Sequence, residues 1–163
     1  MKTITNKNTN IETVEPKIGI FIPCYNVGSI IGSVLDSFSP EVLNQIDTVL
    51  VINNYSTDNT LDVLDKIKNS DHPVASRLVI IHNLGNYGLG GSQKIAYKHF
   101  LDNHFSHFMI IHGDNQGNGN QIAMNFLETF KQYPYIDLIV ASRFMKSSDT
   151  TQYHLLRLFG NIF

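Results

Sequence analysis

The chain has 163 residues, of which 42% are hydrophobic and 16% are charged, and its formal net charge is −2. These values are ordinary for one globular domain that is long enough to bury a core. The negative net charge argues against a nucleic-acid-binding protein, which normally carries a basic patch. The sequence has no apolar run of the roughly 18 residues that a membrane span needs, and no signal-peptide core.

A polar tail precedes the predicted domain. Residues 1–16 are rich in Asn and Thr and are predicted to be disordered. Beyond them, short apolar runs alternate with longer amphipathic stretches. The predicted strands are 18–22, 47–52, 77–82, 107–111 and 137–141, and the predicted helices lie near 28–38, 59–69, 90–105 and 119–133. This order predicts one three-layer α/β/α domain over residues 17–163, with a mostly parallel sheet and right-handed crossovers.

A polar turn follows the first predicted strand. Asn26 and Gly28 predict a tight turn that presents backbone N–H groups to a diphosphate at a helix start, although Gly28 alone is equally typical of a turn without a ligand. Cys24 precedes this turn and is interpreted as a small buried thiol rather than a nucleophile. As the only cysteine, it excludes an internal disulfide and fits a reducing compartment.

The second and third predicted strands also end in polar residues. After the second strand, Asp58 or Asn59 can cap the next helix, and for Asp58 and Thr60 a binding role is the alternative. After the third strand, the glycines of residues 85–91 allow a backbone to approach a ligand closely, or merely form a turn. Lys94, in the helix that follows, is interpreted as solvated surface.

The fourth predicted strand delivers His112, Asp114 and Gln116 at its carboxyl end. Ligands bind beyond the carboxyl ends of strands in open α/β sheets. Carboxylate and amide oxygens suit Mg²⁺ or Mn²⁺, and one or two are enough when substrate phosphates share the ion. His112 can ligate metal, contact a sugar, or serve as a hydrogen-bonded histidine at the strand end.

Five short motifs in this order resemble those of glycosyltransferase family 2, the nucleotide-sugar enzymes of GT-A fold. They read IGIFIPCYN, NNYSTDNT from Asn53, GNYGLGGSQKIA from Gly85, HGDNQ from His112, and ASRF from Ala141. The glycine-rich motif is most similar to that of the polyprenyl-phosphate sugar transferase branch. The resemblance covers about residues 18–163.

The resemblance implies a set of site residues. Those expected to bind the nucleotide sugar are Pro23, Tyr25, Asn26, Asn53, Asn54, Asn86, Gly88, His112 and Asp114. Asp114 and Gln116 are expected to hold Mg²⁺ or Mn²⁺. Asp114, Arg143 and Arg157 are expected to be catalytic, the two arginines by clamping phosphate oxygens. The alternative for Arg143 is an exposed position at the end of a loop. The alternative for Arg157 is a residue of an amphipathic segment that buries its aliphatic stem and keeps its charge in water.

Four positions depart from the family pattern. Asn53 and Asn54 replace an acidic pair, of which a carboxylate accepts a hydrogen bond from the donor's base. Asn accepts through its amide oxygen but brings no charge. Val27 replaces a glutamate, and His112 replaces the first acidic residue of the D-x-D motif. Either the donor differs from the common uridine and guanosine diphosphate sugars, or catalysis has weakened.

The resulting hypothesis is a metal-dependent glycosyltransferase that uses a nucleoside-diphosphate sugar, with a polyprenyl phosphate or a saccharide as acceptor, in cell-envelope polysaccharide or glycolipid synthesis. We expect it to be cytoplasmic, at the inner face of the membrane. Because family members continue beyond Phe163, we expect this chain to hold the donor-binding portion, and a natural short form is the alternative. The rival hypothesis is a degenerate, non-catalytic nucleotide-binding or partner-docking module. A nucleotidyltransferase or flavodoxin-like protein would share only the sheet.

Overall fold

The computed structural model describes residues 16–115 and 117–141, and the chain divides into two compact units, residues 1–128 and 129–163. The elements are β1 (Ile18–Cys24), α1 (Ile31–Asp36), α2 (Pro40–Leu43), β2 (Thr48–Asn53), α3 (Thr60–Lys68), β3 (Leu78–His82), α4 (Gly88–Asp102), β4 (His107–Ile110) and α5 (Gly119–Gln132). Among the described residues, no helix is both long and apolar enough to cross a membrane.

The four strands form one parallel sheet in the order β3-β2-β1-β4. Cys24 pairs with Asn53, and Asn53 pairs with His82, so β1, β2 and β3 end at the same level. The chain leaves β1 toward β2 on one side and returns to place β4 on the other. The carboxyl ends of β1 and β4 therefore flank the topological switch point, where ligands bind in such sheets.

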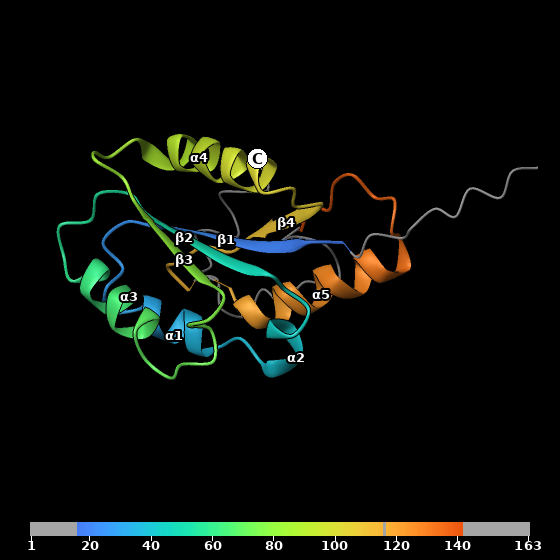
Figure 1. Ribbon diagram of the computed structural model, residues 1–163, viewed down its shortest axis with the longest axis horizontal. Helices are drawn as coiled ribbons and strands as arrows, with labels where there is room; N and C mark the ends of the chain where they lie inside the picture. The colour runs from blue at the N-terminus through green and yellow to red at the C-terminus, as the bar shows by residue number, and fades with distance from the viewer. Residues whose placement is uncertain (1–15, 116, 142–163) are drawn as a thin grey trace, which may run out of the picture. The chain divides into compact units, whose positions relative to one another are not determined.

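Helix α4 covers one face of the sheet, and α1 and α3 cover the other (Figure 1). This arrangement confirms the predicted α/β/α layers in the first unit. On the α4 side, Phe21, Leu50 and Ile52 alternate along their strands and pack against Ala96 and Phe100. Such alternation selects one face because successive strand side chains point to opposite sides.

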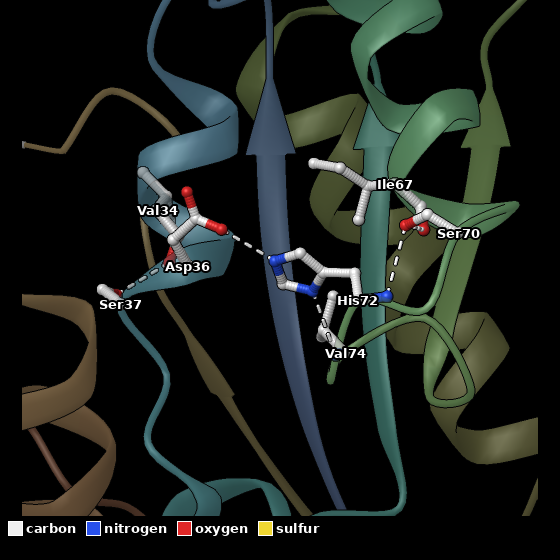
Figure 2. Close-up of polar contacts among 7 residues, drawn as sticks. All are labelled: Val34, Asp36, Ser37, Ile67, Ser70, His72 and Val74. Carbon is white, nitrogen blue, oxygen red and sulfur yellow. Dashed lines mark hydrogen bonds and ion pairs between the residues drawn. The ribbon is translucent and has the colours of Figure 1, made fainter.

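A polar link joins α1 to the loop before β3 on the opposite face (Figure 2). The backbone N–H of Val74 donates to Nδ1 of His72 at 3.1 Å, so this ring nitrogen carries no proton. His72 Nε2–H then donates to Asp36 Oδ1 at 2.8 Å. Asp36 ends α1, so the link lies toward the amino-terminal edge of the sheet, away from the switch point.

The strand predicted over residues 137–141 is wrong. In the second unit, the chain after α5 turns at Tyr133 and continues without regular structure to Ala141. Leu138 and Val140 are 74% and 76% exposed. An apolar run of strand composition becomes a strand only when a neighbouring strand supplies hydrogen bonds and a packing surface, and neither can be read from a short run.

Candidate functional site

A pocket of about 190 Å³ opens at the carboxyl ends of β1, β2 and β4. One wall is the turn after β1, and the first turns of α4 form another. Its lining residues are Pro23, Cys24, Tyr25, Val27, Asn54, Leu89, Ser92, His112, Gly113 and Asp114. The pocket thus occupies the switch point of the sheet, and Asp114 is the one carboxylate among these lining residues.

The turn after β1 is held by the loop that follows β2. Asn26 has a positive φ of 52°, which asparagine tolerates better than most residues. Its backbone N–H donates to Ser56 Oγ at 2.9 Å, and its Oδ1 accepts from the Thr57 N–H at 2.8 Å. Asn26 therefore shapes the turn, while the neighbouring Tyr25 side chain remains half exposed beside the pocket.

Asp58 and Thr60 hold the same turn from the start of α3. The Gly28 N–H donates to Asp58 Oδ2 and the Val27 N–H donates to Thr60 Oγ1, both at 2.9 Å. The prediction that the turn of Asn26 and Gly28 offers its N–H groups to a diphosphate is therefore wrong, because both N–H groups, and that of Val27 between them, donate to side chains of the protein. The Asp58 side chain also accepts from the Thr60 N–H, and Asn59, the N-cap, makes no side-chain cap bond.

The pKa of Asp58 reflects two opposing effects. Partial desolvation raises it, but the hydrogen bonds from the Thr60 hydroxyl and from the Gly28 and Thr60 N–H groups favour the carboxylate. The net result is a pKa below the ordinary value for aspartate. Asp58 is thus an anion that organises the protein's own backbone.

Asn53 and Asn54, neighbours in sequence, occupy different environments. Asn53 is 0% exposed and absent from the pocket lining; its Oδ1 accepts from the Ser56 N–H at 3.1 Å, and its Nδ2 pairs with His82 Nδ1 at 3.0 Å. Asn54 is 6% exposed and lines the pocket. The predicted nucleotide contact is therefore geometrically open to Asn54 and closed to Asn53.

Asn54 ties the ends of β2 and β3 to the start of α4. Its Oδ1 accepts from Asn83 Nδ2 at 2.9 Å and from the Tyr87 N–H at 3.0 Å. Its Nδ2 donates to Asn86 Oδ1 at 2.8 Å. Asn86 also accepts from the Gly88 N–H at 2.9 Å, so Asn86 and Gly88 support the pocket wall without being among the residues that line it.

Close packing brings the segment after β4 to the pocket. A Cβ added to Gly113 would lie 2.7 Å from Cys24 Sγ and 3.0 Å from the Pro23 carbonyl oxygen, so only glycine fits without displacement. This approach leaves His112 and Asp114 exposed at the rim on either side of Gly113. The position of Asp114, the one carboxylate among the described lining residues, thus depends on the absence of a side chain at the preceding residue.

Cys24 is a buried, protonated thiol rather than a nucleophile. Burial is the main effect that raises its pKa to about 12, and the negative charges of Asp114 and Asp58 add to it. Because the thiolate is the nucleophilic form, a thiol with this pKa is unreactive at neutral pH. This agrees with the interpretation of Cys24 as a packing residue.

The described part of the chain contains no cluster of three or more His, Cys, Asp or Glu side chains able to hold a metal. Such a cage is not required, because Mg²⁺ and Mn²⁺ are commonly held by one or two carboxylates together with substrate phosphates and water. Asp114 at an open rim fits that donor set. Gln116, Arg143 and Arg157 lie outside the described residues.

Of the residues predicted to form the site, Pro23, Tyr25, Asn54, His112 and Asp114 line the pocket. Sequence reasoning missed Leu89, Ser92 and Gly113 in the lining and Asn83 behind it. The sequence could have pointed to Asn83, because it is a polar residue directly after a predicted strand. The same kind of position pointed to Asp114, which follows its strand by a few residues. The signal for Leu89 and Ser92 was weaker, since their three-residue spacing on α4 is also typical of core packing.

Comparisons with known proteins found one matching family model and several similar solved structures. A family model described as glycosyl transferase family 2 matches residues 19–162. Crystal structures of S. aureus TarS 1–349, alone and in complex with UDP, share 18% identity over 80% of this chain, with TM-scores of 0.55 and 0.56. Mannosyltransferase PcManGT from Pyrobaculum calidifontis, in complex with GDP-Man and Mn²⁺, shares 22% identity over 53% of this chain, with a TM-score of 0.44.

The chain covers 40%, 39% and 25% of those three structures, respectively. Comparison with curated proteins gave no match.

Proposed function

The chain belongs to glycosyl transferase family 2, and from this membership we propose that it binds a nucleoside-diphosphate sugar and transfers the sugar to an acceptor. The observation that carries the proposal is the pocket at the switch point, where Tyr25 and Asn54 lie in the same lining as Asp114. An exposed aromatic face suits a nucleobase, and a carboxylate suits a cation bound to diphosphate.

Asp114, together with Gln116, would hold Mg²⁺ or Mn²⁺. When bound, such an ion neutralises negative charge on a departing diphosphate. The protein's own share of the work is positional. Gly113 sets Asp114 against the end of β1, and the hydrogen bonds of Asn26 and Asp58 keep the turn after β1 in place. Lining residues held in place in this way would orient the donor for attack.

For the acceptor side we propose a polyprenyl phosphate or a saccharide, with action at the cytoplasmic face of the membrane. This part rests on the motifs, in which Arg143 and Arg157 are 14 residues apart. If they act as the resemblance implies, the guanidinium groups of these two arginines would clamp phosphate oxygens and stabilise the negative charge on the leaving group.

A non-catalytic nucleotide-binding module is the second candidate. It is favoured by the loss of charge at Asn53 and Asn54, whose amides are held by the protein's own groups. The two functions differ in one measurable product. A transferase releases free nucleoside diphosphate from a nucleotide sugar in the presence of metal and acceptor, whereas a binding module leaves the nucleotide sugar intact.

Calorimetric titration with nucleoside diphosphates, with and without Mn²⁺, tests the site. We expect Asp114→Asn to abolish the metal-dependent part of the affinity, because it removes the charge and keeps the shape. Asp102→Asn is the matched control: Asp102 is exposed at the end of α4, where it pairs with Lys98. Equal metal-dependent affinity in the Asp114 variant and the wild type would refute the assignment, provided that both unfold at the same temperature.

A further inference from the structure

Helix α4 has one buried face and one exposed face. Ser92, Ala96 and Phe100 recur every four residues and are buried against the sheet. Figure 1 shows α4 on one side of the sheet, with α1 and α3 on the other. The side of α4 that points away from the sheet carries an outer stripe of five large side chains, which are Tyr87, Lys94, Tyr97, Lys98 and Leu101.

The outer stripe combines exposed apolar area with positive charge. Leu101 is 74% exposed, and Tyr87 and Tyr97 are 53% and 43% exposed. Lys94 and Lys98 are also exposed, one helical turn apart from each other. Tyrosine and lysine each have an apolar body and a polar tip, so both residue types favour the boundary between water and a lipid bilayer. The composition of the stripe is therefore typical of a helix that lies on a membrane surface.

The two sides of the sheet differ in charge. Residues 78–113 carry two Lys and one Asp, all three in α4, whereas residues 31–77, which include α1 and α3, carry seven Asp or Glu and three Lys or Arg. Lys17 adds a positive charge beside the end of α4, since its Nζ donates to the Asn103 carbonyl oxygen at 3.0 Å. A chain with a net charge of −2 therefore has a positive α4 and a negative layer on the opposite side.

The lysines of the outer stripe are available to an external anion. Lys94 has no ion-pair partner among the described residues, and Lys98 pairs with Asp102 at 2.8 Å where both side chains are largely exposed. An exposed pair of this kind contributes little stability, so Lys98 can turn toward another anion. Lysine is depleted in protein–protein interfaces, because its charge must be desolvated there. Two lysines among five side chains thus favour a lipid surface over a protein partner.

Resting on the proposed function for its setting at a membrane, we infer that the outer stripe of α4 docks on an anionic lipid surface. Leu101 and the two tyrosines enter the headgroup region, and the lysines face the lipid phosphates. Helix α4 has 15 residues and is about 22 Å long, and its first turns carry Leu89 and Ser92, which line the pocket. Docking of α4 would therefore bring the pocket close to the bilayer surface, within reach of an acceptor phosphate held there.

The test is co-sedimentation of the full chain with vesicles of phosphatidylcholine alone, or of phosphatidylcholine and phosphatidylglycerol in equal amounts. We expect preferential binding to the anionic vesicles at low ionic strength and its loss in high salt, because salt screens exposed charges. Lys94→Gln should weaken this binding about fivefold, since one lysine near an anionic surface is worth about this factor. Lys66→Gln is the matched control, because it makes the same change at an exposed position of α3, on the opposite side of the sheet, and should leave the binding unchanged.

Two further variants report on the stripe directly. Asp102→Asn removes the one acidic side chain of α4 and frees Lys98, so the affinity for anionic vesicles should rise by a similar factor. Leu101→Trp supplies a fluorescent probe in a chain that has no tryptophan. Its emission should shift to shorter wavelength when anionic vesicles are added, because the indole leaves water. The same probe at the end of α3, in Asn69→Trp, should not shift.

Absence of binding to the anionic vesicles, or equal binding to both kinds of vesicle, would overturn the inference. Equal losses in Lys94→Gln and Lys66→Gln would also overturn it, because the docking surface would then not be α4. A dimer of the chain that is lost in Leu101→Ser would show that the stripe is a protein interface instead. The proposed function is tested separately, because Lys94→Gln should keep the Mn²⁺-dependent affinity for nucleoside diphosphates in the absence of vesicles. Loss of vesicle binding with nucleotide binding retained would overturn the inference alone.

Discussion

Gly113→Ala should disrupt the candidate site through the packing of one methyl group. The new Cβ would lie 2.7 Å from Cys24 Sγ and 3.0 Å from the Pro23 carbonyl oxygen. Heavy atoms of this kind prefer separations of about 3.5–4.0 Å, so the segment after β4 must move away from β1. Overpacking of this sort costs about 1–3 kcal/mol of stability, and the movement should carry Asp114 away from the pocket.

Urea unfolding followed by circular dichroism measures the loss of stability, and titration with a nucleoside diphosphate and Mn²⁺ measures the loss of affinity. Gly90→Ala is the matched control, because Gly90 lies in α4 with open space around its Cβ position. That substitution should stabilise the helix by about 0.5–1 kcal/mol. The two changes are chemically identical and should have opposite signs.

A double-mutant cycle identifies the clashing atom. Cys24→Ala removes the sulfur that lies 2.7 Å from the new Cβ, so part of the cost of Gly113→Ala should disappear in that background. The Pro23 carbonyl contact remains, so recovery should be incomplete. The packing argument is refuted if Gly113→Ala matches the wild type in both stability and nucleotide affinity.

Two further predictions concern pH. The folded state keeps Cys24 protonated up to a pKa of about 12, whereas the unfolded thiol ionises near its ordinary value, so stability should fall as the pH rises between these values. Urea midpoints measured from pH 8 to 11 should fall more steeply in the wild type than in Cys24→Ala, and parallel curves would contradict the burial argument. The pKa of Asp58 is lowered in the folded state, so its contribution is present above the unfolded pKa and is lost as acid protonates the folded carboxylate. Asp58→Asn should flatten the fall in stability between pH 5 and 2 by less than about 1 kcal/mol, because the group is exposed to solvent; a curve as steep as that of the wild type would contradict it.

The architecture of the first unit could be read from local patterns. Runs of branched and aromatic residues marked β1 to β4, and the amphipathic stretches between them marked the helices. The rules for parallel sheets then placed the polar residues after each strand at one edge. Tyr25 and Asp114 could be assigned to the pocket because carboxyl ends of parallel strands must meet there, whatever the details of packing.

Other features depended on contacts between residues far apart in the chain. Whether Asn53 or Asn54 reaches the pocket is decided by the direction in which β2 ends, since adjacent side chains point to opposite sides. The Asn54 amide takes its orientation from Asn83, Asn86 and the Tyr87 N–H. These partners lie 29 to 33 residues away, and no local pattern orients an amide.

The same limit explains the remaining differences. In the sequence, Gly113 looks like an ordinary turn glycine. A side chain is excluded at this position because Cys24 and Pro23, on another strand, occupy the space that a Cβ would need. The apolar run at residues 137–141 has the composition of a strand, yet composition does not provide the pairing partner that a strand requires. Local sequence therefore specifies what a segment can form, and the groups that fold against it select which hydrogen bonds and packing contacts it makes.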